Sequence, residues 1–219
     1  TSGDFNADGK IDLAVGARGY SSDTGRAYIF YNDGSIPTAA ASADIIITGE
    51  STSNFFGYSL TFGDFNADGK TDLAVGAYGY SSNRGRVYMY TFNDGVITGE
   101  TTSNYFGYSL VSGDFNADGK TDLAIGANTY STSTGRAYLF YNDGSIPTTA
   151  ATADVIITGE ANSQFGVAMS SGDFNADGKT DLVVGAVQYS SYTGRAYLFY
   201  NDGSIQTTAA TADVIITGA

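Results

Sequence analysis

The sequence predicts an all-β fold, a β-propeller-type array of four-stranded antiparallel blades. Three observations support this prediction. The octapeptide Gly-Asp-Phe-Asn-Ala-Asp-Gly-Lys occurs four times without change, beginning at Gly3, Gly63, Gly113 and Gly172. Successive copies begin 60, 50 and 59 residues apart, and periods of this size are typical of propeller blades or stacked arrays. The chain also contains 17 Tyr, 13 Phe and 29 Gly, a composition that favours short strands joined by turns.

Each repeat contains four segments with the character of a strand. In the second repeat the first segment is Phe56–Leu60 with its continuation at residues 63–65, and the others are Asp72–Ala77, Gly85–Tyr90 and Val96–Gly99. Such segments of a few apolar residues, bounded by Gly and polar clusters, are strands. The third strand is apolar on both faces, as a sheet covered on both sides requires. The Ala-rich segment 38–43 of the first repeat is too short for a stable helix and is predicted to be a loop.

The repeats predict a single domain over residues 1–219, with blades at about 1–50, 51–100, 101–160 and 161–219. The first repeat lacks the equivalent of residues 51–60, so the first blade is expected to lack most of its inner strand. We therefore expect that these four blades do not close into a complete ring on their own.

Each octapeptide, with the residues that follow it, has the pattern Asp-x-Asn-x-Asp-Gly-x-x-Asp. Side-chain oxygens at positions one, three, five and nine, a backbone carbonyl at position seven and Gly at position six have the spacing of a calcium loop. Position twelve is Val or Ile rather than an acid, which excludes the helical EF-hand, so the loop joins two strands. The sequence therefore predicts about one Ca²⁺ per repeat, four in all. The predicted ligands are Asp4, Asn6, Asp8, Lys10 and Asp12; Asp64, Asn66, Asp68, Lys70 and Asp72; Asp114, Asn116, Asp118, Lys120 and Asp122; and Asp173, Asn175, Asp177, Lys179 and Asp181.

The alternative interpretation is that Asn-Ala-Asp-Gly is only a hairpin turn, because Asn and Asp-Gly favour such turns. A turn alone does not require further acidic residues at a fixed spacing in four copies. The calcium interpretation is therefore preferred, with a structural role for the metal, because three carboxylates in one turn repel one another without a cation.

Two other sets of residues recur in every repeat. Tyr20, Tyr80, Tyr130 and Tyr189 lie in the polar segment between the second and third strands. They are candidates for stacking against a sugar or a partner protein, and the alternative is that they pack on a neighbouring blade. Arg26, Arg86, Arg136 and Arg195 begin the third strand. They are expected to form structural ion pairs, with binding of an anionic ligand as the alternative.

Composition narrows the possible functions. The formal net charge is −13, from 23 acidic and 10 basic residues. Twelve of those acids belong to the four calcium loops, so most of the acidity is assigned to metal ligands. The chain has no basic excess for binding nucleic acid, and no apolar run of the length that crosses a membrane. It has no His and no Cys, and its glutamates, Glu50, Glu100 and Glu160, recur at one blade position and are expected to be structural. An enzymatic function is therefore not expected.

These motifs resemble the FG-GAP repeats of integrin-α-type β-propellers. The Phe-Gly of that family corresponds to Phe56-Gly57, Phe106-Gly107 and Phe165-Gly166, and its Gly-Ala to residues 16–17, 76–77, 126–127 and 185–186. This chain has no Pro after the Gly-Ala, and it has Asn at position three of the loop, where the family often has Asp. Propellers of this type usually have seven blades, whereas four repeats are present here.

The resemblance implies an extracellular or cell-surface, calcium-stabilised module that binds or adheres to a protein or carbohydrate through loops on one face. The near-identity of the repeats leaves a second hypothesis open, in which the chain is a building block of a surface layer or filament and its partners are copies of itself.

Overall fold

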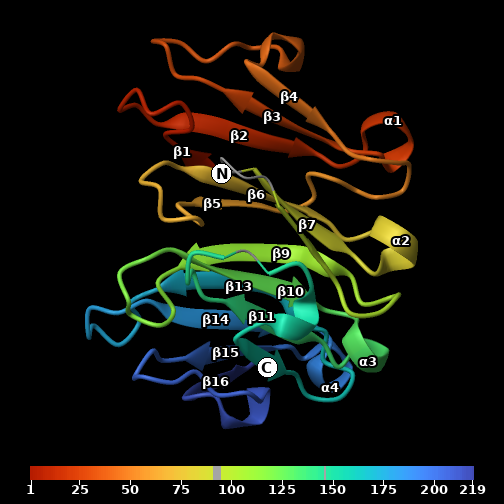
Figure 1. Ribbon diagram of the computed structural model, residues 1–219. Helices are drawn as coiled ribbons and strands as arrows, with labels where there is room; N and C mark the ends of the chain where they lie inside the picture. The colour runs from red at the N-terminus through yellow and green to blue at the C-terminus, as the bar shows by residue number, and fades with distance from the viewer. Residues whose placement is uncertain (91–94, 146) are drawn as a thin grey trace.

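The computed structural model describes residues 1–90, 95–145 and 147–219. These residues form four separate sheets, each of four strands paired in antiparallel fashion in chain order. Figure 1 shows the sheets stacked one after another, from the sheet of β1–β4 at one end to the sheet of β13–β16 at the other. The predicted all-β, blade-like architecture of propeller type is confirmed.

The four blades have closely corresponding strands. The first blade contains β1 (Ser2–Gly3), β2 (Asp12–Ala17), β3 (Arg26–Phe30) and β4 (Ile45–Thr48), and the second contains β5 (Leu60–Gly63), β6 (Asp72–Ala77), β7 (Arg86–Tyr90) and β8 (Gly95–Thr98). The third contains β9 (Phe106–Gly113), β10 (Asp122–Ala127), β11 (Arg136–Phe140) and β12 (Val155–Thr158), and the fourth contains β13 (Phe165–Gly172), β14 (Asp181–Ala186), β15 (Arg195–Phe199) and β16 (Val214–Thr217).

Short helical turns connect the second and third strands of every blade: α1 (Tyr20–Asp23), α2 (Tyr80–Asn83), α3 (Tyr130–Ser133) and α4 (Tyr189–Tyr192). The sequence did not predict these turns. Their central residues are left-handed, with φ of 50° at Ser81, 56° at Ser82 and 61° at Asn83. Positive φ is uncommon outside glycine, so a run of Ser and Asn gives little local signal for this conformation.

The Ala-rich segments of the first, third and fourth repeats also differ from the predicted loop. Each contains one turn of 3₁₀ helix, namely η1 (Ala40–Ser42), η2 (Ala150–Thr152) and η3 (Ala209–Thr211). The segments that contain η2 and η3 dock on the preceding blade, because Thr149 and Thr208 form bridges with Thr98 and Thr158. Ala150 and Ala209 are fully buried there, and burial of this apolar face explains how such a short helix is held.

The core lies between the blades. The Phe of each Phe-Gly pair packs against the preceding blade. It forms a β-bridge with the glycine that comes before the third strand of that preceding blade, as Phe106 does with Gly85. Phe56, Phe106 and Phe165 are at most 1% exposed. Each contacts a tyrosine of its own blade edge to face, with ring centroids 5.3 or 5.4 Å apart. These apolar contacts between the sheets therefore hold neighbouring blades together.

The two end blades expose residues that the inner blades bury. Val15 is 40% exposed, whereas its equivalents Val75, Ile125 and Val184 are fully buried. At the other end Phe174 is 49% exposed, whereas the equivalent Phe115 is 1% exposed. Strand β1 has only two residues. The outer faces of the first and fourth blades are therefore the apolar surfaces of this stack.

Candidate metal centres and the opposite loop face

The four octapeptide loops lie at one edge of the stack. Each joins the first strand of a blade to the second, and Figure 1 shows this edge opposite to the one that carries α1–α4. The arrangement follows from antiparallel pairing, because the beginning and the end of the second strand lie at opposite edges of the sheet. The predicted metal ligands and the predicted tyrosine positions are therefore on opposite edges.

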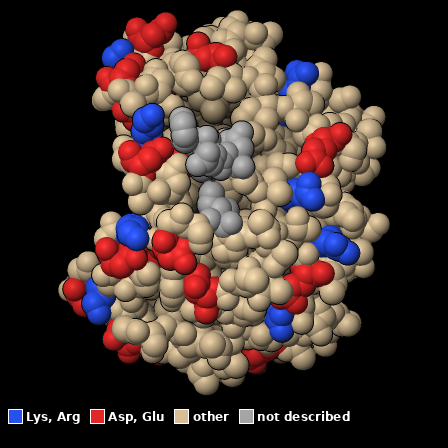
Figure 2. Space-filling model, in the orientation of Figure 1, with Lys and Arg blue, Asp and Glu red and all other residues tan. Residues whose placement is uncertain are grey.

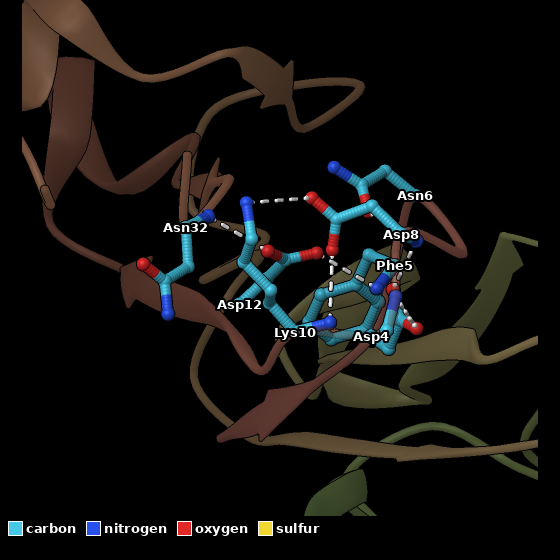
Figure 3. A network of polar contacts seen from close by, with 8 residues as sticks. Asp4, Phe5, Asn6, Asp8, Lys10, Asp12 and Asn32 are labelled. Carbon is cyan, nitrogen blue, oxygen red and sulfur yellow. Dashed lines mark hydrogen bonds and ion pairs between the residues drawn. The ribbon is translucent and has the colours of Figure 1, made fainter. Parts of the chain in front are cut away.

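Hydrogen bonds inside each loop fold its side chains inward, as Figure 3 shows for the first copy. The backbone N–H of Asp8 donates to both Asp4 Oδ1 and Asn6 Oδ1, at 3.1 and 3.0 Å. Gly9 N–H donates to Asp4 Oδ2, and Lys10 N–H donates to Asp8 Oδ1, both at 2.9 Å. Gly9 has φ of 83°, a conformation that glycine adopts without strain. The same bonds recur in the other three loops.

The Asp at position nine has a second role that the sequence did not reveal. Asp122 Oδ2 accepts a hydrogen bond from Phe115 N–H at 2.8 Å, and its Oδ1 accepts one from Asn142 N–H at 2.9 Å. Asp12 and Asp181 accept the equivalent pairs. All four position-nine side chains are at most 4% exposed. This carboxylate therefore fastens the loop to the residues that follow the third strand.

Burial also makes two of these carboxylates, those of Asp72 and Asp122, costly to ionise without a cation. Desolvation raises the pKa of Asp72 and of Asp122 to about 6, and the neighbouring loop aspartates act in the same direction, while the backbone N–H donors oppose them. At the exposed position five, the N–H of Lys10 lowers the pKa of Asp8. The loops of the second and third blades therefore concentrate negative charge at a partly desolvated place, where a bound cation has its largest effect.

The donor set fits a calcium ion in its chemistry, because three carboxylates, one amide oxygen and one backbone carbonyl are all hard oxygen ligands. No three acidic or histidine side chains among the described residues converge in the form of a ready metal cluster. The reason is visible in the hydrogen bonds, since the position-one and position-nine oxygens all accept backbone N–H groups. The carboxylates keep further lone pairs for a cation.

The lysines at position seven do not all extend into solvent. Lys10 Nζ lies 3.6 Å from Asp8 Oδ2, and Lys120 Nζ donates to the carbonyl of Asn142 at 3.0 Å. The ammonium group of Lys120 is therefore held at the protein surface, because the turn after β11 supplies an acceptor.

The recurring tyrosines and arginines lie together at the opposite edge. The guanidinium carbon of the third-strand arginine is 3.6 or 3.7 Å from the ring centroid of the tyrosine in the same blade, from Tyr20 with Arg26 to Tyr189 with Arg195. The contact found is therefore within one blade, whereas the packing alternative placed it on a neighbouring blade. A role of these tyrosines in ligand binding stays a prediction.

The arginines also form the expected ion pairs. Arg86 pairs with Glu50 at 3.0 Å, Arg136 with Glu100 at 3.1 Å and Arg195 with Glu160 at 2.7 Å. Each pair joins a glutamate at the end of one blade to the third strand of the next. The predicted ion pairing of the arginines is therefore confirmed for Arg86, Arg136 and Arg195.

Sequence reasoning missed an aromatic cluster at this edge, formed by Phe55, Tyr58, Tyr78, Tyr105 and Tyr108. Phe55 stacks on Tyr78 with centroids 4.8 Å apart, and Tyr58 lies 4.7 Å from Tyr78 and 4.6 Å from Tyr108. The rings are half-buried, and the Arg18 guanidinium lies 5.3 Å from the Tyr58 centroid. The aromatic residues that flank the Phe-Gly pairs of the second and third repeats were the available signal.

Charge does not mark a nucleic-acid surface. On the face shown in Figure 2, acidic and basic side chains are interspersed, and no continuous basic patch is visible. Among the described residues, no helix has the length and apolar character to span a bilayer.

Fold and loops together define a repeat protein of propeller type. The family model for the FG-GAP repeat matches residues 1–30, 56–90, 106–140 and 165–199. The chain belongs to the FG-GAP repeat family.

Relatives with curated names match part of the chain. Human phosphatidylinositol-glycan-specific phospholipase D is 43% identical over 103 residues, which cover 41% of this chain and 12% of that protein. Mouse integrin alpha-M is 44% identical over 82 residues, covering 36% of this chain and 7% of that protein. Human integrin alpha-IIb is 35% identical over 97 residues, covering 40% of this chain and 9% of that protein. The matches therefore span about a tenth of the length of these relatives.

Among solved structures, the crystal structure of the V. cholerae biofilm matrix protein Bap1 matches 96% of this chain and 38% of that chain. Its sequence identity is 15% and its TM-score 0.37. A similarity of this size carries no argument about function.

Proposed function

We propose that this chain is an extracellular, calcium-stabilised β-propeller module that binds a protein or carbohydrate ligand. The single observation that carries the proposal is the fourfold loop, with its inward hydrogen bonds and buried position-nine aspartate. Residues 1–219 would act as one repeat domain with about one calcium ion per blade, held by the ligand set predicted from the sequence.

Calcium affinity supports the extracellular location. Loops of this class in extracellular modules bind calcium with dissociation constants of about 10⁻⁴ to 10⁻³ M, and such sites fill only where calcium is abundant. The relatives include integrin alpha chains, which is consistent with an adhesion module at the cell surface.

The proposal assigns binding to the edge opposite the metal loops. That edge carries the aromatic cluster and the exposed guanidinium of Arg18. Half-exposed tyrosines combine an apolar ring with a polar hydroxyl, and this is the chemistry that contacts proteins and sugars. We also propose that the chain is not catalytic. The phospholipase D relative matches over 12% of its length, and this chain has no His or Cys to act as a base or nucleophile.

The experiment that tests the calcium role is thermal unfolding in calcium and in excess chelator, together with calorimetric titration. One site at ten times its dissociation constant stabilises the fold by about 1.4 kcal/mol, so four independent sites contribute roughly 5 to 6 kcal/mol. Chelation is therefore expected to lower the melting temperature sharply, and Asp118→Ala to remove one site. Asp143→Ala is the matched control, because Asp143 is an exposed aspartate of the same blade outside the loop. An unchanged melting curve in chelator, with no heat of binding, would contradict the proposal.

A second candidate function is a building block of a layer or filament, favoured by the exposed apolar faces of the end blades. The alternative rests on Val15, Phe174 and Ile216, which are 40%, 49% and 62% exposed. If the end faces join copies of the chain, sedimentation velocity will show polymers whose size increases with protein concentration. Phe174→Ser is expected to reduce the size of these polymers. If the chain stays monomeric at all concentrations, the assembly function is contradicted and the binding module is the one candidate function that remains.

A further inference from the structure

One groove at the helical-turn edge differs from its equivalents in the other blades. It lies between the segment that leads into β9, residues 101–105, and the turn around α3, and its volume is about 540 Å³. Clefts that hold small ligands occupy roughly 300 to 1,000 Å³. No charged side chain lines this groove, and seven of its nine lining residues are Thr or Ser.

The residue at position 129 explains why the groove is open in this blade. In the second blade the same position is Gly79, and a Cβ atom there would lie 2.1 Å from the carbonyl oxygen of Ser53. The two segments therefore touch in the second blade. In the third blade Thr129 occupies this position, and its hydroxyl donates to the carbonyl of Ser103 at 2.7 Å. The threonine side chain stands between the two segments and holds them apart.

The backbone of the groove wall is strained in a way that is specific to this blade. Ser131, Thr132 and Ser133 have φ of 47°, 56° and 62°. The middle residue is Ser in the other three blades and Thr only here. A β-branched residue in the left-handed region is a conformational outlier, and strain of this kind is concentrated at functional sites. The additional methyl group of Thr132 therefore requires an explanation beyond the turn itself.

A buried amide at the groove lacks a partner. Asn104 lines the groove and is 5% exposed, and its Nδ2 has no hydrogen-bond partner among the described residues. An unsatisfied buried donor costs about 1–3 kcal/mol. Asn54 in the second blade has the same unpartnered Nδ2, but there the contact at Gly79 closes the adjacent segments. The unpartnered amide is therefore a feature of both blades, and the third blade differs in the groove beside it.

Tyr105 completes the groove and joins it to the aromatic cluster. Its ring lies 5.2 Å from that of Tyr78 and 6.4 Å from that of Tyr108, centroid to centroid. The groove thus combines an aromatic ring with side-chain hydroxyls that both donate and accept, and no charged side chain lines it.

From this combination we propose that the groove binds one unit of a neutral saccharide. Sugar hydroxyls pair with the hydroxyls of Thr102, Ser131 and Thr132, and the C–H face of the sugar ring packs on Tyr105. This inference rests on the proposed binding function, and it narrows the ligand from protein or carbohydrate to a neutral sugar at one site.

The test is saturation-transfer difference NMR on the calcium-loaded chain, with cellotriose, maltotriose, mannotriose and chitotriose as probes. At least one trisaccharide should show transfer. Thr129→Gly is expected to let the segments close as in the second blade, and Thr102→Arg to fill the groove from an exposed position. Both should weaken binding at least tenfold, and Thr102→Arg, at an exposed position, should do so without a change in melting temperature. Thr52→Arg, at the equivalent exposed position of the second blade, is the control and should bind normally.

Each outcome has a distinct meaning. Loss in both groove variants with retention in the control supports the site. Absence of transfer from all four probes, in a protein that calcium stabilises, overturns the saccharide inference and leaves the proposed calcium-stabilised module intact. Transfer that survives Thr129→Gly and Thr102→Arg also overturns it, because the sugar then binds elsewhere. Failure of calcium to stabilise the chain contradicts the proposed function instead.

Discussion

The close approach of neighbouring blades can be tested with one methyl group. A Cβ atom added at Gly126 would lie 2.2 Å from the carbonyl oxygen of Gly166 in the fourth blade and 2.2 Å from Ser109 Oγ. Both distances are more than an ångström shorter than an ordinary contact of 3.4 Å. The serine cannot move without breaking its own hydrogen bond to the same carbonyl, which is 2.7 Å long. Gly126→Ala therefore forces the third and fourth blades apart.

The expected cost has two parts. Overpacking a close-packed interface costs about 1–3 kcal/mol, and loss of the serine hydrogen bond about 0.5–1.5 kcal/mol. For a domain of this size each kcal/mol lowers the melting temperature by about 2–4 °C. Gly126→Ala is therefore expected to lower it by about 5–15 °C, measured by circular dichroism in saturating calcium.

Gly185 provides the matched control, because it has the same place in the fourth blade but no blade packed against it. A Cβ atom there finds its nearest neighbour at 3.6 Å. Gly185→Ala is expected to be neutral, or to stabilise by about 0.4–1 kcal/mol through the unfolded chain. If the two variants melt together, contact between stacked blades is not what holds this fold, and the reasoning fails.

Two further predictions use other internal comparisons. Phe115→Ala is expected to lower the free energy of unfolding by about 3–5 kcal/mol, since Phe115 is 1% exposed. Phe174 is 49% exposed, so Phe174→Ala should lower it by under about 1 kcal/mol. Equal losses of free energy in urea unfolding would contradict the stacking order. Burial raises the pKa of Tyr197 to about 12, and its hydroxyl donates to Glu160 at 2.9 Å. The protonated phenol is thus favoured in the folded state, so stability present below pH 10 should be lost as the pH rises from about 10 to 12, and Tyr197→Phe should flatten this loss in unfolding midpoints measured across that range.

The strands could be predicted well because they are bounded by residues that recur in every repeat. Residues 72–77 begin with the loop Asp and end with Gly-Ala, and the observed β6 has the same bounds. The first strand was less accurate in the second blade, where β5 begins at Leu60. There Gly57 N–H still donates to Gly76, but this contact lies outside the regular ladder.

The features that the sequence did not reveal depend on residues far apart in the chain. The second role of Asp122 requires the N–H of Asn142, twenty residues later, and no local pattern announces that bond. The aromatic cluster combines rings from two blades, at positions that the fourth repeat fills with Gln164 and Val167. A search for exact repetition passes over such a cluster, because its members are the residues in which the repeats differ.

The loops proposed to bind metal are connected to the stacking of the blades through the turns that follow the third strands. Asn142 Nδ2 in the third blade donates to the carbonyl of Asp64, the first residue of the loop in the second blade, at 2.9 Å. Asn201 Nδ2 makes the same bond to Asp114, one blade further on, at 3.2 Å. The same two asparagines donate their N–H groups to the buried aspartates of their own loops. A cation that orders one loop therefore fixes a turn of its own blade and, through that turn, the loop of the preceding blade. Because each bond couples neighbours only, loss of one ion should weaken two adjacent blades more than the rest of the stack, as in other proteins whose repeats contact only their neighbours.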